Sequence, residues 1–135
     1  MILFRPVGLH ELRLVALSEF REFPPRFRDQ PIFYPVLDLE YARQIARDWN
    51  APDPSSGFAG FVTRFEITES LAARYPVRVA AASRHRELWV PAEELVEFNE
   101  HIQDRIVVIE AYPGPEFVGT IDPETLLPSE LAKTR

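Results

Sequence analysis

Residues 38–50 read DLEYARQIARDWN, and residues 58–68, beyond a short proline-containing loop, read FAGFVTRFEIT. In the first stretch Tyr41, Ile45 and Trp49 recur at helical spacing on one face, and charged residues occupy the other face. Asp38 suits the N-terminal cap, and Pro52 stops continuation of the helix. The stretch therefore predicts an amphipathic helix that buries Trp49 against a sheet.

The second stretch predicts a long strand. Phe61, Thr63, Phe65 and Ile67 alternate with residues that would face the opposite side. Apolar runs and turn residues elsewhere predict strands at 2–4, 31–36, 77–81, 88–90 and 106–111, helices at 10–19 and 91–102, a helical turn at 69–75 and a reverse turn at 83–86. Strands that follow two early helices favour an α+β domain over a doubly wound parallel sheet.

Length and composition bound the domain organisation. The chain has 135 residues, of which 46% are hydrophobic, so it suits one domain with a real core. We expect that domain to span residues 1–112. Four prolines within residues 113–128 predict an irregular tail over residues 113–135.

Charge and residue usage exclude several classes of protein. The net charge of −6 argues against a protein that coats nucleic acid or anionic lipid, and the chain has no cysteine for a disulfide framework or thiol chemistry. No apolar run is long enough for a membrane span, and the first residues do not suit a signal peptide, so we expect a cytoplasmic protein without a membrane partner. Fourteen of the fifteen basic residues are arginine, which fits coding bias or phosphate recognition.

Motif searches exclude the commonest catalytic sites. His10, His85 and His101 are too far apart in sequence for a common metal-ligand motif, so no metal is expected. No serine lies in a Gly-x-Ser-x-Gly elbow. Arg5 after the first strand, Tyr34 ahead of the amphipathic helix and Glu87 at the start of a late strand remain as candidates, although each also suits a purely structural role.

The chain resembles a family of small bacterial proteins that often carry the label "ADP-ribosylation/crystallin J". The resemblance covers about residues 1–112 and lies in six segments: FRPVG at 4–8, FPPR at 23–26, QPIFYPV at 30–36, IARDWN at 45–50, VTRF at 62–65 and LWVPAEEL at 88–95. ADP-ribosylglycohydrolases are much larger, mostly helical enzymes with aspartate-bound magnesium. The layout of this chain is instead similar to that of ADP-ribosyltransferases.

That resemblance implies a mostly antiparallel split sheet with two to three helices and a site for NAD or ADP-ribose. NAD would be the substrate that donates ADP-ribose. By the family pattern, Arg5 holds a phosphate or ribose of NAD, Tyr34 lines the nicotinamide pocket and Glu87 is the catalytic carboxylate at the nicotinamide ribose. His85 stands two residues before Glu87, where arginine-modifying members of the superfamily usually carry a glutamate or glutamine.

Two further residues complete the expected site. Arg26 belongs to a stiff, basic loop at 21–31 that is expected to border a bound nucleotide, and alternation places Trp89 on the same side as Glu87, as an aromatic wall. Leu88 and Val90 then face the core. Two alternatives stay open: a non-catalytic interaction or regulatory module in which Glu87 pairs with Arg5, and an enzyme that acts on RNA phosphates or nucleotide ends.

Overall fold

The computed structural model describes residues 1–80 and 85–132, and its centre is a three-stranded antiparallel sheet. Strand β3 (Ala59–Ile67) lies between β1 (Ile2–Gly8) and β7 (Ile102–Pro113), in the order β1-β3-β7. Strand β1 continues through Pro6, which the sequence places beyond the end of the strand. Proline is tolerated there because β1 is an outer strand of this sheet, where a missing N–H need not break a ladder.

Two short pairs of antiparallel strands extend the antiparallel architecture. Strand β4 (Arg78–Val79) pairs with β5 (Arg86–Glu87), and β2 (Ile32–Phe33) pairs with β6 (Val90–Pro91). Val36 bridges Phe4 on one side and Glu87 on the other, so it connects the central sheet to β5. Residues 83 and 84 of the expected turn lie outside the described residues.

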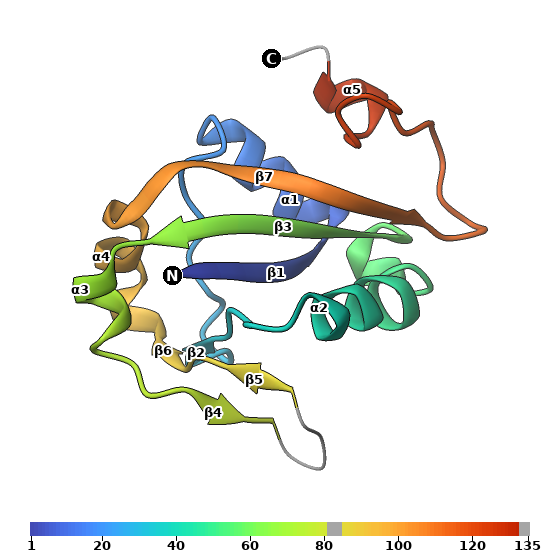
Figure 1. Cartoon of the computed structure of the whole chain (residues 1–135). Helices are drawn as coiled ribbons and strands as arrows, with labels where there is room; N and C mark the ends of the chain where they lie inside the picture. Colours follow the sequence, from blue (N-terminus) through green and yellow to red (C-terminus); the bar gives the residue numbers. More distant parts are fainter. Residues whose placement is uncertain (81–84, 133–135) are drawn as a thin grey trace.

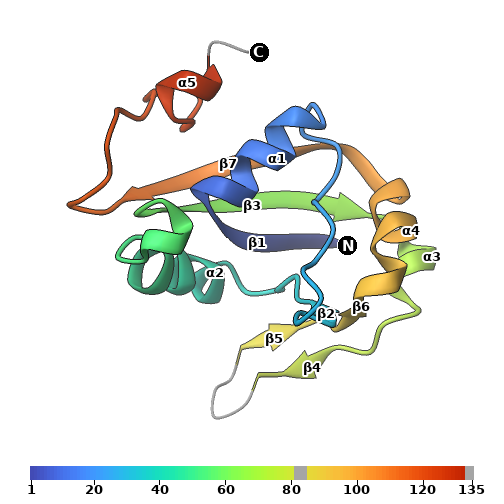
Figure 2. The same ribbon diagram turned by 180° about the vertical axis from the view of Figure 1, so that it is seen from behind.

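Helices lie on both faces of the central sheet (Figures 1 and 2). Helix α1 (Leu9–Leu17) covers one face, and α2 (Leu39–Ile45) packs against the other, where it continues into a π-helical turn, Ala46–Asn50. A 3-10 turn (Pro54–Ser56) precedes β3, and another (Ala92–Glu94) leads into α4 (Leu95–Glu100). Helices α3 (Glu69–Ala72) and α5 (Ser129–Ala132) are single turns. The chain is therefore an α+β domain with antiparallel sheets.

The alternation of β3 divides the core in two. Phe61, Phe65 and Ile67 belong to the larger apolar cluster beneath α1, whereas Val62 joins Ala42 and other residues of α2 in the smaller cluster. This division follows from the period of two along a strand. Hydrophobic side chains on the two faces of β3 thus pack against α1 on one side and α2 on the other.

Trp49 contradicts the expected burial of the amphipathic helix, since its side chain is 71% exposed. The small residues Ala42 and Ala46 make the contact instead and are fully buried. A Cβ on Gly60 would lie only 2.1 Å from the carbonyl oxygen of Ala46, so the helix backbone sits directly on β3. Trp49 lies with Tyr41 and Ile45 on an adjacent face of the helix, which the sheet does not cover at Trp49.

Replacing this tryptophan therefore has a small expected effect. Trp49→Ala should change the free energy of unfolding by no more than about 0.5 kcal/mol, as for other exposed positions. Urea denaturation checks this value, and emission from Trp49 in a Trp89→Phe background should be red-shifted and freely quenched. A loss of about 3–5 kcal/mol, typical of a buried tryptophan, would contradict the exposed position.

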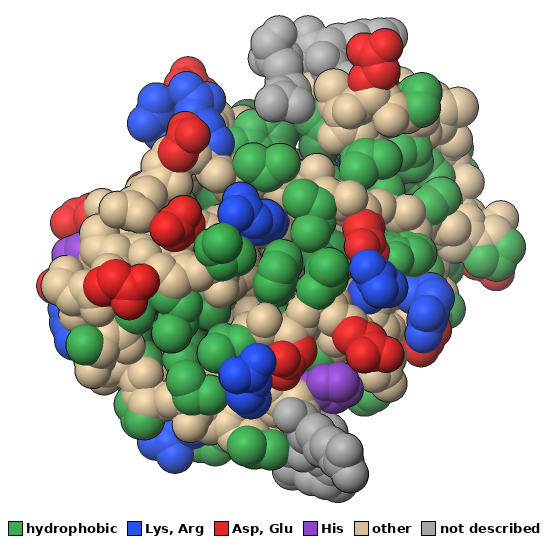
Figure 3. Space-filling model, in the orientation of Figure 1, with side chains coloured by type: hydrophobic (Ala, Val, Ile, Leu, Met, Phe, Trp, Pro, Cys, Tyr) green, Lys and Arg blue, Asp and Glu red, His purple; other side chains and the backbone are tan. Residues whose placement is uncertain are grey.

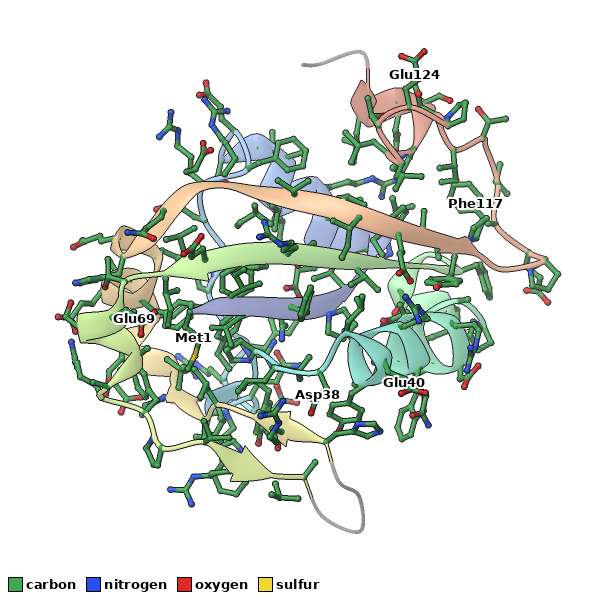
Figure 4. All side chains as sticks on the ribbon, in the orientation of Figure 1. Met1, Asp38, Glu40, Glu69, Phe117 and Glu124 are labelled. Atoms are coloured by element: carbon green, nitrogen blue, oxygen red, sulfur yellow. The ribbon has the colours of Figure 1, made fainter. Side chains whose placement is uncertain are left out.

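Residues of the tail return to the domain. Leu127 is 1% exposed within the larger core cluster, and Ile121 and Pro128 form a β-bridge. Arg13 on α1 forms an ion pair with Glu130 at 2.9 Å. In Figure 4, Phe117 lies on the tail, and Glu124 points to solvent beyond α5. The tail thus packs beside α1 and β7 over the segment that the structure describes.

None of the helices described for residues 1–80 and 85–132 has the length and apolar character needed to cross a membrane. Charged side chains of both signs are interspersed with hydrophobic ones on the face shown in Figure 3, and no broad basic patch forms there.

Candidate functional site

A cleft of about 520 Å³ opens between β1, α2 and the β4–β5 pair. Arg5, Tyr34, Glu87 and Trp89, four of the five expected site residues, line it. Tyr41 and Ile45 from α2 form a further wall, and Pro6, Val36 and Ala80 complete the lining. The volume falls within the usual range for small-molecule sites.

Glu87 is held in the cleft by the sheet. Its backbone pairs with Val36 on one side and with Arg78 on the other, and the residue is 9% exposed. The Trp89 indole Nε1–H donates a hydrogen bond of 2.9 Å to Glu87 Oε1. Leu88 is fully buried, so alternation leaves Glu87 and Trp89 on the cleft side, as the sequence predicts. The carboxylate is thereby fixed in one orientation.

Aromatic rings surround this carboxylate. Tyr34 and Trp89 meet edge to face with ring centroids 6.2 Å apart, and both are partly exposed. Tyr41 stacks on the His85 ring at 4.6 Å. Burial, reinforced by the negative charge of Glu87, raises the pKa of the Tyr41 hydroxyl, so this group stays neutral and able to donate at physiological pH. The cleft therefore combines planar aromatic walls with the buried carboxylate of Glu87 and the guanidinium of Arg5, which Glu11 neutralises.

A salt bridge fixes the beginning of α2 beside the cleft. The Arg86 backbone N–H donates to Asp38 at 2.6 Å, and its guanidinium donates to the same carboxylate at 2.9 Å. These hydrogen bonds lower the pKa of Asp38, so the carboxylate stays ionised. Figure 4 shows Asp38 between α2 and β5. The contact keeps Tyr41 opposite the strand that carries Glu87.

Arg5 lies at the edge of the cleft, but its guanidinium has partners elsewhere. It makes two hydrogen bonds with Glu11 of α1, at 2.7 and 3.0 Å, and Cζ lies 4.5 Å from the centroid of the Phe33 ring. The residue is 8% exposed. Arg5 therefore pairs with Glu11, and the contact of Glu87 is with Trp89, which differs from the Arg5–Glu87 ion pair of the interaction-module alternative.

Arg26 lies in a neighbouring cleft of about 370 Å³, which shares Arg5 and Pro6 with the first. Its Nε donates to the Ile32 carbonyl oxygen at 3.2 Å. Partial burial, together with the positive charge of Arg5, lowers the pKa of Arg26, although an arginine remains protonated at neutral pH. The basic loop thus borders the back of the candidate site, separately from the rings around Glu87.

Arg78 is a candidate that the sequence analysis does not single out. It stands opposite Glu87 in the β4–β5 register, and its Cζ lies 4.5 Å from the centroid of the Trp89 ring. The residue is exposed. Among the residues that the structure describes, no carboxylate is within ion-pair distance of Arg78. Only the hairpin register identifies it, because its position in sequence resembles that of any exposed strand arginine.

The described residues contain no group of three or more histidine, cysteine, aspartate or glutamate side chains arranged to hold a metal ion. No family model, curated protein or solved structure matches this chain. Function is therefore inferred from the side chains of the cleft.

Proposed function

We propose that the cleft binds NAD through its nicotinamide end, and that Glu87 then acts on the nicotinamide ribose as in an ADP-ribosyltransferase. The observation that carries this proposal is a buried carboxylate, fixed by Trp89, inside a cleft walled by Tyr34, Tyr41 and Trp89. The oxidised nicotinamide ring is planar and positively charged. Aromatic faces and a nearby carboxylate favour such a ring.

The same geometry supports the chemistry of glycosidic cleavage. As the bond between nicotinamide and ribose breaks, positive charge develops on the ribose, and the leaving nicotinamide takes the bonding electron pair and becomes neutral. A fixed carboxylate stabilises the oxocarbenium-like ribose electrostatically. Glu87 is suited to this role because its orientation is set before a ligand arrives.

Arg78 supplies the cation that the pyrophosphate of NAD requires. Its exposed guanidinium stacks on Trp89 at the rim of the cleft, and five N–H donors match phosphate oxygens in pairs. Arg5 is less suited to this role because Glu11 already neutralises its charge. We therefore assign the phosphate contact to Arg78 rather than Arg5.

The proposal is tested by measuring the binding of ligands that differ at the nicotinamide ring. We expect NAD⁺ to bind at least about tenfold more tightly than NADH, whose nicotinamide is uncharged, and more tightly than ADP-ribose, which lacks the ring. Isothermal titration calorimetry with NAD⁺, NADH, ADP-ribose and nicotinamide measures each affinity. Equal affinities for NAD⁺ and NADH would contradict the placement of the charged ring beside Glu87.

A pair of arginine variants tests the phosphate contact. Arg78→Gln should weaken NAD⁺ and ADP-ribose to a similar extent and reduce the salt dependence of binding, since both ligands carry the pyrophosphate. Arg74→Gln, an exposed arginine outside the lining of both clefts, is the matched control. If neither NAD⁺ nor ADP-ribose binds the wild-type protein, the enzyme proposal fails and an interaction module takes its place.

A further inference from the structure

A second cavity lies where α1 ends, between the edge of β7 and the returning tail. Its volume is about 500 Å³, again within the range of small-molecule sites. Apolar walls come from Ala16, Phe20, Ile106, Val108 and Leu127, and Arg105 lies at its rim. Glu19, Val107 and Thr125 complete the lining. Three segments far apart in sequence thus enclose one space, and none of the lining residues belongs to the two clefts around Arg5.

Unfavourable backbone conformations gather around this cavity. Of the five non-glycine residues with positive φ among those described, four are in or next to the cavity lining: Glu19, Phe20, Asp104 and Leu126, with φ between 60° and 62°. Left-handed backbone costs roughly 1–2 kcal/mol for a residue with a side chain. Glu19 and Phe20 end α1, where their N–H groups donate to the carbonyl oxygens of Ala16 and Val15, so helix termination accounts for both. Leu126 is a bulky residue without that explanation. Such strain concentrates at ligand sites.

The guanidinium of Arg105, at the rim of the cavity, is the candidate group for binding an anion. Its Nη1 donates 2.9 Å to the main-chain carbonyl oxygen of Glu19. Among residues 1–80 and 85–132, no carboxylate forms an ion pair with it. The guanidinium therefore retains donors for an external anion, directly beside apolar walls. The cavity lining holds one guanidinium, that of Arg105, and one carboxylate, that of Glu19, so selectivity for an anion depends on the donors that Arg105 retains.

We propose that this cavity binds a small amphipathic carboxylate, with its apolar body against Phe20, Val108 and Leu127 and its head group on Arg105. Burial of the apolar body supplies affinity, and the bidentate guanidinium–carboxylate contact supplies selectivity for the anion. The tail residues take part directly, since Leu127 forms one wall. The proposal is independent of NAD binding.

Three probes that share a ten-carbon chain, used below their micellar concentrations or solubility limits, separate the effect of charge from that of apolarity. We expect decanoate to bind at least about tenfold more tightly than decanol, and decyltrimethylammonium to bind least, as measured by calorimetry on the 135-residue chain. Chemical shifts of residues 16–20, 105–108 and 125–127 should change on adding decanoate. Binding of the cationic probe with equal or greater affinity would overturn the proposal.

Variants of the protein then test where the carboxylate head group and the apolar chain of decanoate bind. Arg105→Gln should weaken decanoate binding at least about tenfold and leave decanol binding unchanged, whereas Arg74→Gln, outside the cavity lining, should alter neither. Ala16→Phe should fill the cavity and abolish both, whereas Ala73→Phe, at an exposed position, should not. Thr125→Phe provides a second filling variant if Ala16→Phe fails to fold.

The outcomes distinguish the two sites. Retained NAD⁺ affinity in Arg105→Gln, together with lost decanoate affinity, supports a separate site. Unchanged decanoate affinity in both Arg105→Gln and the filling variants would overturn it, whether or not the wild-type protein binds NAD⁺.

Discussion

Phe33→Ala should lower the free energy of unfolding by about 3–5 kcal/mol, as large aromatic truncations in cores do. Phe33 is fully buried, with its ring centroid 5.2 Å from that of Phe23 and 5.5 Å from that of Phe98. It also supports the guanidinium of Arg5, which lies 4.5 Å from the ring centroid. Removal of the ring leaves a cavity in the core, and the Arg5–Glu11 ion pair loses the aromatic face against which its guanidinium packs.

Urea denaturation of matched variants measures this loss. Phe27→Ala, in the preceding loop, is the control, because Phe27 is 74% exposed and its replacement should change stability by less than about 0.5 kcal/mol. Phe33→Leu should be intermediate and gives a value if the alanine variant does not fold. Equal stabilities of Phe33→Ala and Phe27→Ala would show that Phe33 is not in the core.

Glu87→Gln should reduce NAD⁺ cleavage, measured as nicotinamide release, by at least about a hundredfold. The substitution keeps the shape of the side chain and an oxygen that can accept the Trp89 indole hydrogen bond. It removes the charge that would stabilise the developing positive ribose. We therefore expect the melting temperature to change by no more than about 4 °C, equivalent to about 1 kcal/mol for a domain of this size.

The control for this substitution is Glu66→Gln on β3, where the side chain is exposed and outside the cleft. It should cleave NAD⁺ at the wild-type rate. If wild-type protein releases nicotinamide and Glu87→Gln does so equally fast, Glu87 is not the catalytic carboxylate. A large fall in melting temperature with lost binding would instead assign Glu87 a structural role.

The strand β3 and the side chains that it buries follow from the local sequence. Alternation in residues 58–68 predicts both the length of β3 and the division of its side chains between two apolar clusters. The same rule buries Leu88 and Val90 and leaves Glu87 and Trp89 on the other side. These predictions succeed because the period of a strand is a local property of the backbone.

Partners and exposure depend on contacts between distant segments. The sequence places Trp49 on the apolar face of its helix, yet the helix contacts β3 through Ala42 and Ala46 and leaves Trp49 exposed. An irregular tail is the local expectation after Tyr112, but Leu127 finds a place in the core. The exposure of Trp49 and the burial of Leu127 do not follow from the helical or strand period, because each depends on which other part of the folded chain lies against that residue.

The candidate site shows the same division. The sequence by itself selected Arg5, Tyr34, Glu87 and Trp89, and their positions on strands and near helix starts are local features. Only the tertiary structure paired Arg5 with Glu11, seated Glu87 against the Trp89 indole and placed Arg78 opposite it. An ion pair or a cleft requires side chains from several elements to converge, and the directions in which they converge are set by sheet register and helix packing.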